Sequence, residues 1–232
     1  MKISSETLSI LKNFRDLNSN ILIKEGSLIK TLTPAKNVMA TVTVKETFPV
    51  SFGIWDLTTL LGTVSLFDDP NFIFEDKYVL IEGSNGSKVK YFYSEPSLLT
   101  VPTKDVNMPS SVVSFDLTDK TLSDLKKAAS VLNLTDLSIC SDGKNISAIV
   151  TDKKNVTSNN YSIAVGENEE GYKFNFDFKI DNLRFFPGNY EVEIAEKIVS
   201  QFKNKNIDLC YWVALESSSS FISESKSAVG VM

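Results

Sequence analysis

Hydrophobic residues recur at helical spacing in two separate stretches of the chain, residues 8–17 and 122–131. In each stretch, apolar side chains stand three or four positions apart, which places them on one face of an α-helix. Ser4 and Thr118 precede the two stretches as N-cap residues, and a leucine follows each cap four positions later. The pattern therefore predicts two capped, amphipathic helices built in the same way.

These two helices belong to a longer internal repeat. The hexapeptide TLSILK (Thr7–Lys12) returns as TLSDLK (Thr121–Lys126), which is 114 positions later. Residues 48–66 then match residues 174–192 at an offset of 126. In both of these matched segments an alternating apolar strand leads into a short helix that ends at a glycine, and the drift in offset is what loop insertions would produce.

Elsewhere the dominant pattern is alternation of apolar and polar residues, the period of a half-buried β-strand. The segments VKYFYS (Val89–Ser94) and YKFNFDFKI (Tyr172–Ile180) both follow it. Acidic-glycine pairs inside Ile23–Ile29 and Cys140–Ile146 predict β-hairpins at corresponding places in the two repeats. The fold class predicted is α+β, with antiparallel sheets dominating.

The repeat also predicts the domain organisation. We expect a first domain at residues 1–100 and a second at 114–232. The segment between them, 101–113, contains two prolines and few periodic residues, which is typical of a connector.

Composition narrows the possible functions. The 232 residues include 42 % hydrophobic residues, enough for a substantial core, and carry a net charge of −5. There is no histidine, and Cys140 and Cys210 lie in apolar runs, so we expect buried reduced thiols, no metal site and no cofactor. The lack of histidine and of phosphate-binding glycine motifs also argues against an enzyme.

Targeting and membrane segments are not expected either. The first residues are charged rather than apolar, unlike a secretory signal. No apolar run approaches the roughly 18 residues that a membrane span needs. We therefore expect an intracellular protein that does not cross a membrane.

The polar faces of the two repeated helices are the strongest candidate for a binding surface. Taken singly, each is typical of a solvated helix, and that interpretation stays open. The acidic net charge of the chain, and the lysine kept at Lys12 and Lys126, favour a shared cationic surface instead. The candidate residues are Lys12, Arg15, Lys120, Lys126 and Lys127, with Arg184 of the second short helix as an extension.

Four motifs follow one another along the chain: ILKNFRDLNS, IWDLTTLLGTVSLFDD, FPGNY and YWVALE. In this order they resemble the sliding clamps of T-even-type bacteriophages, the processivity factors of replicative DNA polymerases. The resemblance implies the DNA-clamp fold, with two duplicated domains that each pack two helices on antiparallel sheet. It further implies a homotrimeric ring around double-stranded DNA, no catalysis, and a location in the cytoplasm of the infected host.

The resemblance also assigns roles and partners. The candidate cations would contact phosphates without reading sequence, as a sliding protein requires. The implied protein partners are the replicative DNA polymerase and a clamp loader, and short apolar tails would dock in a pocket near the connector. Val101, Val106 and Met108 are the candidates for that pocket, although they could equally be connector residues packed on the sheets.

Two other functions stay open at this point. A duplicated β protein could be a phage structural or adhesin-like module without enzymatic activity. Asp68 and Asp69 could form the carboxylate pair of a hydrolase, but acidic residues before proline are ordinary turn chemistry.

Overall fold

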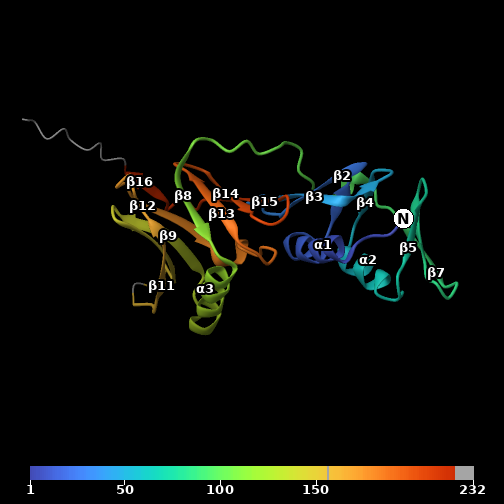
Figure 1. The fold of residues 1–232 in the computed structure, drawn as a ribbon, viewed down its shortest axis with the longest axis horizontal. Helices are drawn as coiled ribbons and strands as arrows, with labels where there is room; N and C mark the ends of the chain where they lie inside the picture. Colours follow the sequence, from blue (N-terminus) through green and yellow to red (C-terminus); the bar gives the residue numbers. More distant parts are fainter. Residues whose placement is uncertain (156, 223–232) are drawn as a thin grey trace, which may run out of the picture. The chain divides into compact units, whose positions relative to one another are not determined.

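The computed structural model describes residues 1–155 and 157–222 (Figure 1). The chain divides into two compact units. Unit 1 contains Met1–Val106 together with two later segments, Arg184–Phe186 and Ile207–Tyr211. Unit 2 begins at Asn107 and contains most of the remaining chain. The domain limits given above from the sequence stay a prediction, and each unit is described by itself.

Unit 1 places two helices on one side of its strands (Figure 1). Strands β1 and β4 form a pair, β2 pairs with β3, and β5, β6 and β7 form a three-stranded antiparallel sheet. Helix α1 contacts β2, β3 and the second helix, α2. The elements are α1 (Ser5–Leu17), β1 (Ile21–Ile23), β2 (Gly26–Leu32), β3 (Val38–Phe48), β4 (Phe52–Ile54), α2 (Leu57–Val64), β5 (Asn71–Phe74), β6 (Tyr78–Glu82), β7 (Lys88–Phe92) and the 3₁₀ turn η1 (Pro96–Leu98).

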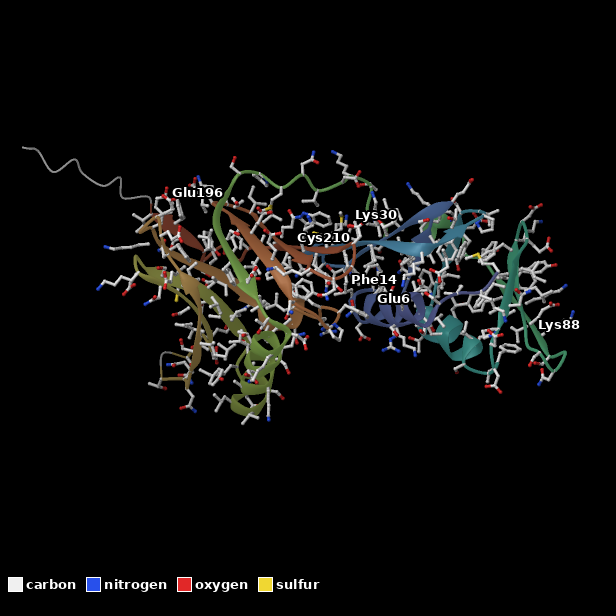
Figure 2. All side chains as sticks on the ribbon, in the orientation of Figure 1. Glu6, Phe14, Lys30, Lys88, Glu196 and Cys210 are labelled. Atoms are coloured by element: carbon white, nitrogen blue, oxygen red, sulfur yellow. The ribbon has the colours of Figure 1, made fainter. Side chains whose placement is uncertain are left out.

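Helix α1 begins where the sequence predicts. The Ser4 side chain accepts a hydrogen bond from the Thr7 backbone N–H at 3.2 Å, which satisfies one of the otherwise unpaired donors of the first turn. Ile10 and Leu11 are each 2 % exposed and Phe14 is fully buried beneath the strands (Figure 2). Burying side chains of this size stabilises the packing by about 1.5–3 kcal/mol each.

The hairpin predicted within Ile23–Ile29 is wrong. Strand β1 pairs with β4, and β2 pairs with β3, so the two strands flanking the turn do not pair with each other. Gly26 adopts a left-handed φ of 106°, which turns the chain into a different sheet there. An acidic-glycine pair specifies a change of direction, but the strand partners are chosen by packing.

Unit 2 is built around a five-stranded antiparallel sheet in the order β11–β10–β9–β12–β16 and a further group of strands, β14–β13–β8. The hairpin predicted within Cys140–Ile146 is confirmed: β9 and β10 pair across Gly143, which has φ 106°. The elements are β8 (Ser111–Leu117), α3 (Asp119–Leu132), β9 (Asp136–Asp142), β10 (Asn145–Thr151), β11 (Tyr161–Glu167), β12 (Lys173–Lys179), η2 (Ile180–Asn182), β13 (Tyr190–Ala195), β14 (Val199–Asn204), β15 (Leu209–Ala214, whose first residues lie in unit 1) and β16 (Ser220–Ile222).

Helix α3 repeats the cap of α1, but the second helix does not recur. Thr118 accepts a hydrogen bond from the Thr121 N–H at 3.1 Å, as predicted. In place of the expected short helix before Gly188, the described chain forms only η2, one 3₁₀ turn without a side-chain cap. Pro187 disfavours the helical conformation of the residue before it, whereas Asp56 caps α2 through the Thr58 N–H at 2.8 Å.

Asp177 ties the sheet of unit 2 to the segment that follows β15. The residue is 1 % exposed, and its carboxylate pairs with the Lys153 ammonium. It also accepts hydrogen bonds from Ser138 at 2.8 Å and Ser218 at 2.6 Å. Burial alone raises the pKa of Asp177, but the hydrogen bonds and the Lys153 charge outweigh it and hold the pKa below its ordinary 3.8.

Replacing Asp177 with asparagine should lower the free energy of unfolding by about 2 kcal/mol at pH 7, because the variant lacks a buried charged hydrogen-bond acceptor. A depressed folded-state pKa contributes stability above the unfolded pKa, and that stability disappears as pH falls. The difference between wild type and Asp177→Asn should therefore shrink below about pH 4. Urea unfolding over a pH series measures it, and a difference that is constant from pH 7 to pH 3 would contradict this role.

Candidate nucleic-acid interface

Packing sets which side of α1 faces outward. The buried residues of the helix lie on one broad face, and Lys12 lies about 160° around the helix from its centre. Lys12 is exposed and forms no ion pair with any residue that the structure describes. Leu8, predicted on the apolar arc, is only half-buried, because Thr7 takes the inner position and donates to Glu46 at 2.5 Å. The buried residues are Thr7, Ile10, Leu11, Phe14 and Leu17.

Helix α3 buries a narrower face. Leu122, Leu125 and Ala129 are its buried residues. The prediction that Val131 lies on the apolar face is wrong. Val131 is 70 % exposed, because it lies about 180° around the helix from Leu122. Lys127 lies nearly opposite the buried face and is exposed. Lys126 lies on the border of that face and is half-buried, so it is a weaker candidate for an outer contact than the sequence suggested.

The two repeated helices share a cap but differ in rotation. Their caps are 114 positions apart, yet the buried pairs Thr7 and Leu122, Ile10 and Leu125, and Phe14 and Ala129 are all 115 apart (122 − 7). One residue corresponds to a rotation of about 100°. Judged by burial, the counterpart of Lys12 is therefore Lys127 and not Lys126.

Two of the candidate cations have acidic neighbours. Lys120 forms an ion pair with Asp124 one turn later at 2.5 Å, and the hydrogen bond and charge of Asp124 raise the pKa of Lys120. Arg15 pairs with Asp16 at 2.8 Å. The charge of Lys120 is therefore partly compensated within its own helix. Both pairs are solvent-exposed. They lower the local positive charge, but each contributes little to stability.

Arg184 lies at the C-terminal end of α1. Its guanidinium donates a hydrogen bond to the Asp16 carbonyl oxygen at 3.2 Å, and its own carbonyl accepts one from the Asn13 side chain at 2.9 Å. A cation there is favourable, because helix carbonyls leave partial negative charge at that end. Arg184 therefore lies on the surface of unit 1. The prediction that it belongs to a second short helix of the second repeat is wrong.

Asn13 and Tyr211 hold this segment in place, and the sequence analysis missed both. The fully buried Tyr211 hydroxyl donates to Asn13 at 2.7 Å and accepts from the Phe186 N–H at 3.0 Å. The Phe185 ring lies 4.5 Å from the Tyr211 ring, centre to centre. Tyr211 stands in the YWVALE motif, but nothing in the local pattern indicated a partner 198 positions away.

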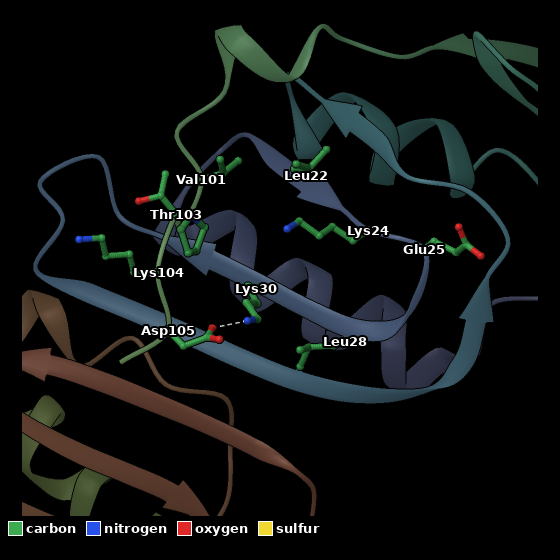
Figure 3. A pocket seen from close by; sticks show the side chains of 10 residues that line it. Leu22, Lys24, Glu25, Leu28, Lys30, Val101, Thr103, Lys104 and Asp105 are labelled. Atoms are coloured by element: carbon green, nitrogen blue, oxygen red, sulfur yellow. Dashed lines mark hydrogen bonds and ion pairs between the residues drawn. The ribbon is translucent and has the colours of Figure 1, made fainter. Parts of the chain in front are cut away.

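A pocket of about 570 Å³ lies in unit 1 between the connector and strands β1 and β2 (Figure 3). Val101 lines it, as predicted for a docking site; Val106 and Met108 are half-buried and are not among its described lining residues. The sequence analysis missed the contribution of β2, although period-two alternation puts Leu28 and Lys30 on the face opposite the buried Ile29. The full lining is Leu22, Lys24, Glu25, Leu28, Lys30, Val101, Pro102, Thr103, Lys104 and Asp105.

The remaining sequence candidates have plain structural roles. Asp69 is 82 % exposed in a turn, has a left-handed φ of 53° and pairs with Lys2 at 2.7 Å. Cys140 and Cys210 are thiols outside any disulfide, and both are half-buried, not buried as predicted. Across residues 1–155 and 157–222, no cluster of three or more metal-ligating side chains is found. In the same ranges, no helix has the length and apolar character to cross a membrane.

Comparison with known proteins points to one family. A sequence model for the family described as "gp45 sliding clamp, C terminal" matches residues 114–217. The chain is 29 % identical to a protein named sliding clamp from Vibrio phage KVP40 over 221 residues, covering 93 % of this chain and 99 % of that protein. It is 27 % identical to the sliding clamp of Enterobacteria phage T4 over 231 residues, covering 94 % and 98 %.

Solved structures agree at the level of fold. Proliferating cell nuclear antigen from Thermococcus kodakaraensis superimposes with a TM-score of 0.66 at 11 % identity, covering 91 % of this chain and 96 % of that one. The antigen from Entamoeba histolytica gives 0.64 at 12 % identity, covering 90 % and 94 %. The predicted α+β clamp fold is confirmed, and so is the resemblance to phage sliding clamps.

Removing the Tyr211 hydroxyl should destabilise the segment that carries Arg184. Tyr211→Phe removes the hydrogen bonds that the hydroxyl makes with the Phe186 N–H and the Asn13 side-chain oxygen, so we expect the free energy of unfolding to fall by about 1–2 kcal/mol. Tyr161→Phe, on the partly exposed strand β11, is the matched control and should change it by less than about 0.5 kcal/mol. Equal effects in urea unfolding would show that the buried hydroxyl network contributes nothing.

Proposed function

We propose that this chain, a homologue of the phage sliding clamps over nearly its whole length, encircles duplex DNA as a ring of identical subunits and tethers a replicative DNA polymerase. The near-complete, end-to-end match to the curated clamps carries the proposal, because both halves of the repeat are included. The clamp fold is consistent with it. The adhesin-like alternative has no comparable support.

The DNA contact that we propose is electrostatic and independent of sequence. Lys12 and Lys127 are its central residues, since each lies opposite the buried face of its own helix and is exposed. Arg15, Lys120, Lys126 and Arg184 contribute as secondary cations, weakened by acidic neighbours or partial burial. Phosphate contacts of this kind hold the duplex without favouring any register along it, which allows sliding.

We propose that the ring closes as a homotrimer through sheet edges. Strand β7 is an edge of one sheet in unit 1, and β11 is an edge of the five-stranded sheet in unit 2. An unpaired edge presents N–H and C=O groups to another chain. β7 exposes Lys88, Lys90 and Phe92, while β11 ends at the exposed Glu167, so charge and apolar area favour pairing between subunits.

The polymerase and a clamp loader complete the proposed partners. Short apolar tails of such partners would dock in the pocket beside Val101, where Leu22 and Leu28 add apolar surface and the volume suits a few side chains. We propose no catalytic role: Asp69 is an exposed turn residue paired with Lys2 and has no arranged partner for acid–base chemistry among the described residues. The place of action would be the cytoplasm of the infected host.

Charge reversal at Lys12 and Lys127 should weaken retention on DNA. On linear primed DNA with free ends, the double variant Lys12→Glu, Lys127→Glu should stimulate a cognate polymerase several-fold less than wild type. The slope of log affinity against log salt should fall by about 0.9 for each phosphate that the variant no longer neutralises. Lys144→Glu, Lys197→Glu carries the same charge change on hairpin turns and should behave as wild type; equal weakening by both double variants would refute the assignment of the helix faces.

The proposed ring makes a second prediction. Sedimentation over a concentration series should show trimers, and Phe92→Glu should raise the concentration needed to form them about tenfold, because an exposed aromatic side chain at the subunit edge is replaced by a charge. Leu66→Glu is the control, since Leu66 is also exposed, at 74 % against 66 % for Phe92, but lies outside the strands. A chain that stays monomeric at all concentrations would contradict the proposed ring.

A further inference from the structure

The pocket beside the connector is cationic although the chain is acidic. Its lining carries three lysines, Lys24, Lys30 and Lys104, against two acids, Glu25 and Asp105, a local balance of +1 (3 − 2) in a chain of net charge −5. Lys24 and Lys104 form no ion pair with any described residue. In Figure 3 the nitrogen end of Lys24 points toward the connector side of the pocket.

One of these lysines already forms an ion pair with an acidic residue of the same chain. Lys30, on β2, forms an ion pair with Asp105, on the connector (Figure 3). The Asp105 side chain is 73 % exposed, whereas that of Lys30 is 29 % exposed. The ammonium is therefore part of the pocket wall, and the carboxylate comes to it from the outside.

We propose that Asp105 is an internal competitor for the ligand of this pocket: the pocket takes a peptide that combines apolar side chains with a carboxylate, and the peptide carboxylate displaces Asp105 from Lys30. The inference rests on the proposed docking of partner tails at this pocket. It specifies the chemistry of the tail and a residue of this chain that opposes its binding.

The structure makes such an exchange easy. Exposed ion pairs contribute little to stability, so Asp105 is readily replaced by another carboxylate at the same ammonium. Residues 99–110 contain no helix or strand, so the connector can shift without breaking a ladder of backbone hydrogen bonds. Leu22, Leu28 and Val101 lie within the same pocket, where apolar side chains beside the carboxylate would be covered.

The charged groups of the pocket also favour acidic peptides over apolar or basic ones. A purely apolar peptide would leave the Lys30–Asp105 pair intact and gain nothing from Lys24. An acidic peptide gains Lys24 and Lys30 together, and releases Asp105 to water, where a carboxylate is well solvated. A basic peptide would meet the lysines as like charges and be rejected.

The probe is a random-decapeptide display library, selected on the full chain and counter-selected on Leu28→Asp, so that retained peptides need the pocket. Leu28 is 45 % exposed, so its substitution should leave the fold intact. The best binder is then synthesised in two forms, one as selected and one with each Asp or Glu replaced by its amide. Affinities of both are measured by fluorescence anisotropy.

We expect the selected peptides to be rich in acidic and apolar residues. Asp105→Asn should bind the acidic form about two- to fivefold more tightly than wild type, and Lys30→Gln should bind it more weakly by a similar factor. Binding of the amide form should be unchanged by either variant. In the Lys30→Gln background, Asp105→Asn should have no further effect, because the competitor then has no ammonium to occupy.

Asp116→Asn is the matched control. It removes one charge and breaks a comparable exposed pair, with Lys205 at 2.5 Å, that lies in unit 2. If Asp116→Asn tightens binding as much as Asp105→Asn, or if the amide form gains equally, the competitor role is overturned and the docking site stands. If no peptide depends on Leu28, the docking site and the competitor both fall.

Discussion

Burial of one apolar face per helix is the constraint on which the rest of the molecule depends. The buried side chains of α1 and α3 each contribute about 1.5–3 kcal/mol, whereas an exposed ion pair contributes at most about 1 kcal/mol. The core therefore sets how each helix is rotated, and the surface charges follow. Lys12 and Lys127 face outward because Phe14 and Leu125 face inward.

The exposed cations of α1 and α3 are few and partly compensated, which suits the proposed function, because a sliding protein must contact DNA without binding tightly at one position. Lys120 and Arg15 have acidic neighbours, which lower the local positive charge, and both of these ion pairs are exposed and therefore weak. A strongly cationic, rigid surface would bind phosphates tightly at fixed positions. In the proposed ring, a few exposed lysines on a body of net charge −5 would attract DNA without a preference for any base pair.

Much of the fold could be predicted from the sequence, because its signals are local. The caps at Ser4 and Thr118, the β9–β10 hairpin and the α+β class all follow from spacing within a few residues. The errors lie where a distant partner decides. β1 chooses β4 over β2, and Arg184 is held by Asn13 and the neighbourhood of Tyr211. The helical wheel failed at Val131 for a different reason: stepping three residues at a time drifts by about 60° per step, which carries the arc around to solvent.

The second copy of the repeat has no helix that corresponds to α2, and this is a clear structural difference between the two halves of the chain. At the repeat offset of 126, Thr58 of α2 corresponds to Arg184 (184 − 58). In the first copy this segment is helical and packs on α1; in the second it forms neither helix nor strand between η2 and β13, and it also contacts α1, through Asn13 and Asp16. Helix α1 is thus the meeting point of both versions of one repeated segment. Pro187 and the absence of a cap free the second version from helical geometry, and that freedom is what lets Arg184 reach the end of α1.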